Sequence, residues 1–288
     1  MIAGARVEIA PYKRDPADFV MWKPSNSDQP GWGSPWGRGR PGWHIECSAM
    51  SREYLGKTFD IHGGGRDLVF PHHENELAQS FCAHKGVQLA RYWLHNGFVT
   101  VSGEKMAKSL GNILTINSLL KNHSGETIKL ALLSAHYRQP MDWTPDVLAQ
   151  AKKALDRWYR AASVQPDLEG EVDKTVLKSL YDDLNTPGAI ASLHRLADEA
   201  LAGSLQAAAD LRKSAGIIGI LQQESDSWFQ SSEGLHLENS KIELLIERRD
   251  EARSNRDYAE ADRIRAELES AGIILEDGDS KTKWRRAE

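Results

Sequence analysis

The chain is poor in cysteine and has no long apolar run. Only two cysteines occur among its 288 residues, Cys47 and Cys82, which excludes a disulfide framework and favours a reducing compartment. No stretch of about 18 apolar residues is present to span a bilayer, and the first residues lack the apolar core of a secretory signal. These absences predict a soluble, cytoplasmic protein that does not bind membranes.

An excess of basic charge is also missing. The formal net charge is -5, which argues against a protein that coats DNA or RNA by bulk electrostatics. Any RNA partner must therefore meet a local basic patch. The length and the 40% hydrophobic content suit one large or two ordinary globular domains.

The first half of the sequence alternates short apolar runs with helical patterns. Strands are expected at Phe19–Trp22, Thr58–Ile61 and Phe98–Val101, each ended by turn residues. Helices are expected at Trp43–Leu55 and Pro71–His84, each followed by a glycine stop. This alternation predicts an α/β domain with parallel strands.

The second half contains a succession of helical patterns. Thr144 and Pro145 are typical of a helix start, and apolar residues follow at helical spacing to about Ala162. Further helices are expected over residues 173–185, 187–202, 205–221, 239–254 and 257–270. The end of the chain reads as a strand, a turn and a second strand, so this half is predicted to be an all-α bundle with a small C-terminal segment.

Cysteine, histidine and glutamate occur at a spacing that could hold a metal. His72 and Glu76 lie four residues apart in a helical pattern, so both can converge on one ion with Cys47, a donor set that suits Zn²⁺. His62, before three glycines, lies where a strand ends and where the backbone can approach a ligand closely. From residue types alone, a buried thiol and a solvated helix face remain the simpler explanation.

The loop GEKMAKSLGN (residues 103–112) carries a second group of polar residues. Lys105 and Lys108 lie between glycine pivots, and Ser109 adds a hydroxyl. Two lysines on a mobile loop can stabilise a triphosphate as charge moves onto its leaving group. An exposed polar turn is the alternative.

Both groups occur in the order found in one family. The KMAKS stretch resembles the KMSKS signature of class I aminoacyl-tRNA synthetases, with Ala107 in place of a serine. The stretches GWHIECSAM, HGGGRDLVFPHHENE and HNGFVTVSGEKMAKSLGN together resemble the cysteinyl-tRNA synthetases. The resemblance covers essentially the whole chain.

This resemblance implies roles for particular residues. Cys47, His72 and Glu76 match zinc ligands of the family, and Trp43 and His62 match positions that line its cysteine pocket. Soft thiolate binds Zn²⁺ whereas the serine hydroxyl does not, so zinc would discriminate between the two amino acids.

The implied reaction joins L-cysteine to tRNA-Cys in two steps, with ATP and Mg²⁺ as substrate. Lys108 matches the residue that contacts ATP, supported by Lys105 and Ser109.

The resemblance also implies a domain organisation. Residues 1–140 would form the C-terminal part of a Rossmann-like catalytic domain, 141–235 a tRNA-binding bundle, and 236–288 an anticodon-binding segment. Near the end, the cations of KTKWRR around Trp284 suit phosphate contact and base stacking, although a solvated tail is equally compatible with the composition.

Two family features have no counterpart here, namely the His-x-Gly-His motif and the fourth zinc ligand, a cysteine. We therefore expect a partial nucleotide fold with an uncovered sheet edge and an exposed apolar face. The chain would be a truncated enzyme, or one half of a split enzyme with a separate N-terminal half, and inactive alone. The alternatives are a non-catalytic tRNA-binding module and a ligase that joins cysteine to an amino sugar in mycothiol synthesis.

Overall fold

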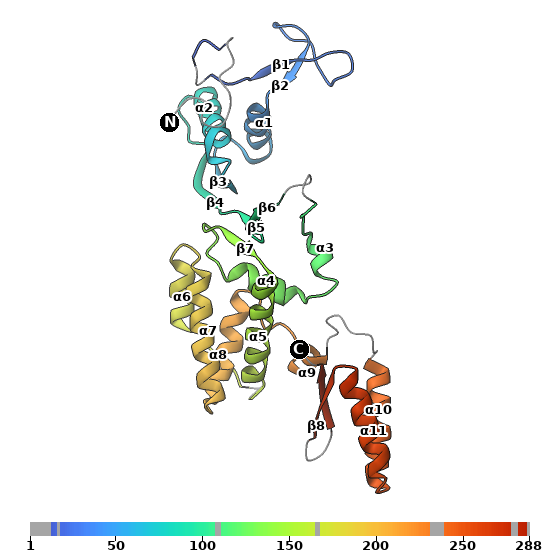
Figure 1. The fold of residues 1–288 in the computed structure, drawn as a ribbon. Helices are drawn as coiled ribbons and strands as arrows, with labels where there is room; N and C mark the ends of the chain where they lie inside the picture. The colour runs from blue at the N-terminus through green and yellow to red at the C-terminus, as the bar shows by residue number, and fades with distance from the viewer. Residues whose placement is uncertain are drawn as a thin grey trace. The chain divides into compact units, whose positions relative to one another are not determined.

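The structure is a computed structural model that describes residues 13–15, 18–106, 111–164, 168–230, 239–277 and 282–286 (Figure 1). The chain divides into two compact units, Met1–Phe98 and Val99–Glu288. No helix among the described residues is both long and apolar enough to cross a membrane.

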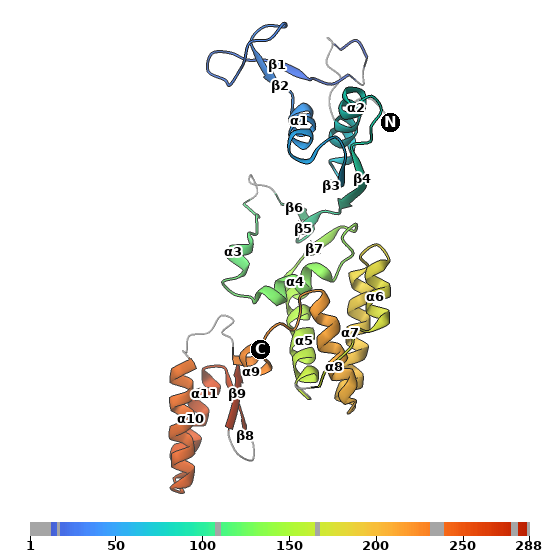
Figure 2. The same cartoon turned by 180° about the vertical axis from the view of Figure 1, so that it is seen from behind.

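The first unit is an α/β arrangement built on one parallel strand pair. Its elements in chain order are β1 (Trp22–Pro24), β2 (Gly39–Pro41), α1 (Trp43–Leu55), β3 (Phe59–Gly65), a π-helical turn (Val69–His73), α2 (Glu74–Ala83) and β4 (Ala90–Asn96). Strands β1 and β2 pair antiparallel, whereas β3 and β4 pair in parallel. Helices α1 and α2 lie side by side, as both views show (Figures 1 and 2).

Helix α1 has the predicted bounds because glycines flank it. Gly42 precedes the helix, and a Cβ there would lie 2.0 Å from the carbonyl oxygen of Val20, so only glycine fits without a shift of the backbone. Gly56 ends the helix with φ 90°, a conformation that side chains disfavour. The predicted helix from Trp43 to Leu55 is confirmed.

Two expectations for this unit were wrong. The first strand lies at Trp22–Pro24 and not at Phe19–Trp22, because its position is fixed by pairing with β2. The predicted helix from Pro71 begins at Glu74, because a π-helical turn precedes it and Phe70 inside that turn has extended backbone angles. Strand β4 was not predicted.

The strand pair has the exposed apolar side chains expected of a partial fold. Ile61 and Tyr92 are partners in the parallel register, and they are 62% and 66% exposed. Among the described residues, no third strand pairs with β3 or β4. The buried apolar cluster of this unit is small, consisting of Phe59, Leu89 and Ala90.

The second unit begins with a three-stranded sheet and continues as helices. The sheet has the order β6-β5-β7, made of β5 (Val99–Val101), β6 (Glu104–Lys105) and β7 (Met141–Trp143), with β5 and β7 parallel. The helices are α3 (Ile116–Leu119), α4 (Gly125–Leu133), α5 (Pro145–Ala162), α6 (Lys174–Tyr181), α7 (Thr186–Leu201), α8 (Leu205–Ile217), α9 (Ser225–Gln230), α10 (Asn239–Ser254) and α11 (Tyr258–Ser270). Strands β8 (Ile273–Asp277) and β9 (Thr282–Arg286) form an antiparallel pair.

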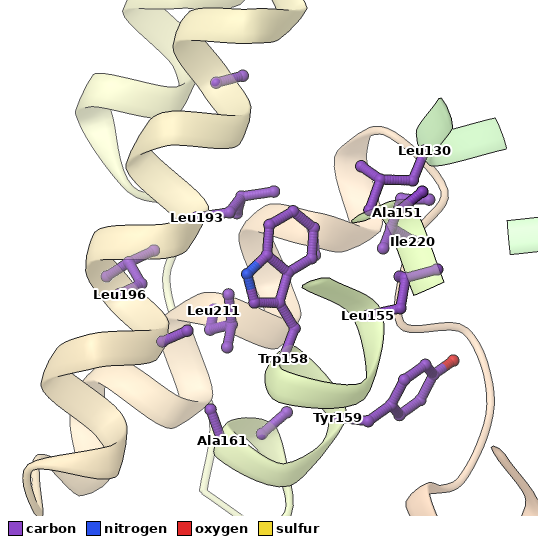
Figure 3. Close-up of a cluster of buried hydrophobic side chains, with 14 of the residues drawn as sticks. Leu130, Ala151, Leu155, Trp158, Tyr159, Ala161, Leu193, Leu196, Leu211 and Ile220 are labelled. Carbon is purple, nitrogen blue, oxygen red and sulfur yellow. The ribbon is translucent and has the colours of Figure 1, made fainter. Parts of the chain in front are cut away.

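The core of this unit lies between α5, α7 and α8. Trp158 of α5 is fully buried against leucines of the neighbouring helices, including Leu193 and Leu211 (Figure 3). Burial of each such side chain contributes about 1.5–3 kcal/mol, so this cluster stabilises the packing of the three helices. The predicted start of α5 is confirmed, since the Thr144 side chain accepts a hydrogen bond from the amide of Val147.

A buried carboxylate fixes the segment after α8 to α4 and α5. Glu126 accepts hydrogen bonds from the Tyr159 hydroxyl at 3.0 Å and from the amides of Leu221 and Gln222 at 2.9 and 3.0 Å. The predicted helix over 205–221 therefore ends earlier, at Ile217, because the last residues turn toward this carboxylate.

The C-terminal elements form a separate apolar cluster. Trp284 of β9 is only 6% exposed and packs with Ile242, Ile264 and Ile273. The suggestion that Trp284 stacks on an RNA base was therefore wrong, because the indole is part of the core. The strand, turn and strand expected at the end of the chain are represented by β8 and β9.

Candidate functional site

Three side chains from neighbouring elements of the first unit converge. Cys47 lies in α1, His72 in the π-helical turn and Glu76 in the first turn of α2. One ligand atom of each lies within 4.8 Å of the others, with Glu76 and His72 buried and Cys47 half-buried. The structure thus brings together the three residues that sequence spacing singled out.

Glu76 is a buried carboxylate that contacts two histidines. Its oxygens approach His62 Nε2 at 2.8 Å and His72 Nε2 more closely still, and the side chain is 1% exposed. Burial lowers the pKa of both histidines, which favours the neutral imidazoles. Burial raises the pKa of Glu76 to about 7, against the opposing effect of a hydrogen bond from the Cys47 thiol.

The Cys47 thiol, like the Glu76 carboxyl, has a raised pKa. Burial raises its pKa, and the negative charge of Glu76 raises it further. A divalent cation between thiol, imidazole and carboxylate would stabilise the deprotonated forms of both acids. Sulfur, nitrogen and oxygen donors of these types are ligands that Zn²⁺ takes in proteins, so Cys47, His72 and Glu76 would suit it.

The ring of His72 is held on its other side. Its Nδ1 lies 2.9 Å from His44 Nδ1, and the Trp43 ring stacks on it at 4.2 Å between centroids. A partner on the second ring nitrogen orients a ligand histidine, and here Nε2 of His72 faces Glu76. Trp43 and His62, the predicted pocket residues, therefore both adjoin the three converging side chains.

Two further histidines at the site were missed from the sequence. His73 is buried and its Nδ1 lies 2.8 Å from His95 Nε2, while His62, His73 and Glu76 form a second group with ligand atoms within 4.8 Å. The signal that could have indicated these histidines is their position relative to the strand ends. His95 lies near the C-terminal end of β4, where ligands bind in parallel sheets, while His62 lies in the middle of β3.

The lysine loop belongs to the second unit, and only its base is described. Gly103 donates a backbone hydrogen bond to the Asp142 carboxylate at 2.8 Å, and the Thr100 hydroxyl donates to the same oxygen at 2.7 Å. These bonds lower the pKa of Asp142 and fasten the hairpin to β7. Lys108 and Ser109 lie outside the described residues, as does the side chain of Lys105.

Three family models match successive parts of the chain. The one described as the catalytic domain of "tRNA synthetases class I (C)" matches residues 1–153, the "DALR domain" matches 175–222, and the "Cysteinyl-tRNA ligase anticodon binding domain" matches 239–285. The first of these covers more than half of the chain.

Curated relatives match throughout. Cysteine–tRNA ligases of Paramagnetospirillum magneticum, Parvibaculum lavamentivorans and Rhodospirillum centenum are 55%, 53% and 56% identical over 99%, 100% and 100% of this chain. The chain spans 64% of the length of each. A solved LeuRS of Agrobacterium radiobacter K84, in a complex with tRNA and LeuAMS, is 15% identical over 65% of this chain and 31% of its own, with a TM-score of 0.48. On the family model and these relatives, the chain belongs to the cysteine–tRNA ligase family of class I aminoacyl-tRNA synthetases.

Proposed function

We propose that this chain is the part of a cysteine–tRNA ligase that holds the metal and binds tRNA, acting in the ATP-dependent activation of L-cysteine and its transfer to tRNA-Cys. The observation that carries the proposal is the convergence of Cys47, His72 and Glu76 on one point. Curated relatives named cysteine–tRNA ligase match this chain over nearly its full length. The two free cysteines support the cytoplasm as its compartment.

A single Zn²⁺ would be held by Cys47, His72 and Glu76, whose donor atoms suit it. When bound, zinc supplies a soft Lewis acid for the thiolate of cysteine, which serine cannot match. His62, in contact with Glu76, and Trp43, stacked on His72, would border the amino acid. The half-exposed indole of Trp43 would exclude water from that side.

ATP with Mg²⁺ would be bound with help from the lysine loop. Lys105 and Lys108 would neutralise the leaving pyrophosphate, and Ser109 would add a hydrogen bond. Anchoring of the hairpin by Asp142 supports this role, because it fixes the base of the loop at Gly103. The region after residue 141 would bind the tRNA. Residues 1–140 would belong to the catalytic domain, 141–235 would form the tRNA-binding bundle, and 236–288 would bind the anticodon.

A separate N-terminal half would complete the active site. The exposed apolar side chains of the β3–β4 pair, Ile61 and Tyr92, support a missing neighbour because such surfaces are normally covered. This chain alone is therefore expected to be inactive.

The test is cysteine-dependent exchange of pyrophosphate into ATP, followed by charging of tRNA-Cys. We expect the chain alone to show neither pyrophosphate exchange nor tRNA charging. Addition of the N-terminal part of the Paramagnetospirillum ligase should restore both activities. Robust exchange by the chain alone would contradict the expected dependence on a partner. Binding of tRNA without exchange, even with that part supplied, would contradict the proposed catalytic role.

A further inference from the structure

The contact between α1 and α2 is polar, although the two helices carry opposite sides of the candidate metal site. The buried residues of α1 are His44 and Ser48, and those of α2 are Glu76 and Ser80. Among the described residues, the apolar cluster of this unit includes none from α1. Apolar packing is non-directional and is nearly absent here, so directional polar contacts must set the separation of the helices.

Besides the hydrogen bond of the Cys47 thiol to Glu76, a second side-chain hydrogen bond joins the two helices. Ser48 Oγ donates to Gln79 Oε1 at 2.7 Å, between residues 31 positions apart. Ser48 follows Cys47 in α1, and Gln79 lies one turn after Glu76 in α2. The bond therefore connects the helix of the thiol to the helix of the carboxylate, immediately beside both.

The bond persists in either orientation of the amide. If the Gln79 nitrogen faces Ser48, it donates to Oγ, and the hydroxyl proton is free for the carbonyl oxygen of His44, 3.2 Å away. That orientation would also give a partner to Gln79 Nε2, which is buried without one in the first orientation. In both cases Ser48 and Gln79 hold each other inside a water-poor interface, where such bonds are strong.

We propose that Ser48 and Gln79 are a positioning pair that sets the distance between the Cys47 sulfur and the Glu76 carboxylate for metal binding. The inference rests on the proposed zinc site. Zinc requires its sulfur and oxygen ligands at about 2.3 and 2.0–2.2 Å, and a small shift between the helices carries one ligand out of reach. Neither Ser48 nor Gln79 touches the metal in this account.

The test is zinc affinity, measured in the full chain by competition with a chromophoric chelator. Ser48→Ala and Gln79→Met should each weaken binding about 10–100-fold, the range for residues that orient metal ligands. The double variant should bind about as weakly as the single variants, because the two changes remove one shared bond. Ser48→Thr, which keeps a hydroxyl, should restore most of the affinity.

Ser51→Ala is the matched control. Ser51 lies one turn further along α1, and its hydroxyl donates within the same helix to the carbonyl oxygen of Cys47 at 2.7 Å. It makes no bond to α2 among the described contacts, so its removal should leave zinc affinity unchanged. Circular dichroism of the zinc-free variants separates a change at the site from a failure to fold, and the Co²⁺ spectrum reports whether the ligand geometry has changed.

The outcomes are distinct. Zinc binding by the Ser48→Ala and Gln79→Met variants within about twofold of the unmodified chain would overturn the inference and leave the metal site intact. A double variant whose loss of zinc affinity equals the product of the two single losses would also overturn the inference, because the two residues would then act independently. If the unmodified chain itself binds no zinc, the proposed metal site fails, and the inference fails with it.

Discussion

Asp183 shows how one exposed carboxylate ties together segments far apart in the sequence. It has a φ of 52°, and its oxygens accept hydrogen bonds from the Tyr137 hydroxyl at 2.8 Å and from Arg138 Nε at 2.6 Å. The Arg138 guanidinium, followed by the Tyr137 hydroxyl, lowers the pKa of Asp183 to about 2. The segment between α4 and β7 is thereby fastened to the turn between α6 and α7.

Stability should depend on pH through this residue. A carboxyl whose pKa is lower in the folded than in the unfolded protein stabilises the fold above the unfolded value, and this contribution is lost as pH falls toward 2. Asp183→Asn should therefore lower the thermal unfolding midpoint at neutral pH, with the difference from the unmodified chain shrinking below about pH 4.

The control for this prediction is Asp182→Asn. Asp182 is the neighbouring exposed aspartate and forms no ion pair among the described residues. Its replacement should give no such pH-dependent difference. A gap between Asp183→Asn and the unmodified chain that stays constant or widens toward low pH would contradict the assignment.

At single positions, the sequence indicated the candidate metal ligands, but it did not indicate which other side chains are buried or in contact. The convergence of Cys47, His72 and Glu76 was expected from the resemblance to the cysteinyl-tRNA synthetases, because residue types alone favoured a buried thiol and a solvated helix face. The contact of His73 with His95 could not be predicted, since it joins the π-helical turn to β4 across 22 positions of sequence. The aromatic Trp284 looked available for stacking, but packing against three isoleucines buries it.

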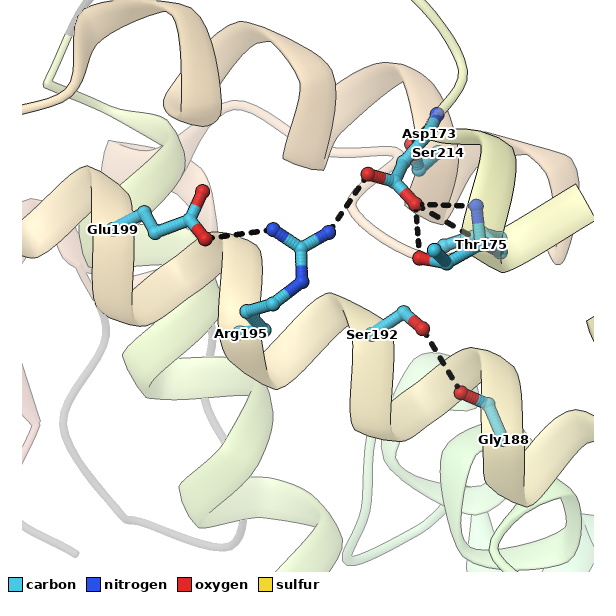
Figure 4. Close-up of polar contacts among 8 residues, drawn as sticks. Asp173, Thr175, Gly188, Ser192, Arg195, Glu199 and Ser214 are labelled. Carbon is cyan, nitrogen blue, oxygen red and sulfur yellow. Dashed lines mark hydrogen bonds and ion pairs between the residues drawn. The ribbon is translucent and has the colours of Figure 1, made fainter.

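At the scale of elements, Asp173 both starts α6 and links it to α7. Its carboxylate accepts hydrogen bonds from the amides of Thr175 and Val176 at 2.8 and 3.2 Å, and Arg195 of α7 contacts its other oxygen at 2.7 Å (Figure 4). Ser214 of α8 also accepts a hydrogen bond from the Asp173 amide. One residue thus joins three helices.

Two substitutions separate the cap from the ion pair. Asp173→Ala removes both and should lower the free energy of unfolding by about 1–2 kcal/mol, the usual range for a lost N-cap. Asp173→Asn keeps a cap oxygen and removes only the partly exposed ion pair, which is worth about 0–1 kcal/mol. Urea unfolding measures both, and equal losses in the two variants would show that the cap contributes nothing.

Elements with local start and stop signals could be predicted, and those defined by distant partners could not. Flanking glycines fix α1, and Thr144 with Pro145 fixes the start of α5. Strand β7 is three residues long and exists because it pairs with β5, 42 positions earlier in the chain. The π-helical turn was missed because its residues read as the first turn of α2.

At the scale of the whole molecule, two units carry two parts of one proposed chemistry. The first contains the thiol, imidazoles and carboxylate of the candidate metal site, and the second contains the lysine loop and the helices matched by the DALR model. The family could be predicted from the sequence because its motifs are long. The chain spans 64% of the length of the curated relatives named above.

The most direct test of the central claim uses the two cysteines of the chain as a matched pair. Both are free thiols, with Cys47 at the candidate site and Cys82 exposed further along α2. The measurement is the zinc content of the purified full-length chain, with Co²⁺ substitution to detect a sulfur–metal charge-transfer band. We predict one metal per chain with that band, both retained in Cys82→Ala and both lost in Cys47→Ala. Retention of metal and band in Cys47→Ala, or their loss in Cys82→Ala, would contradict the account.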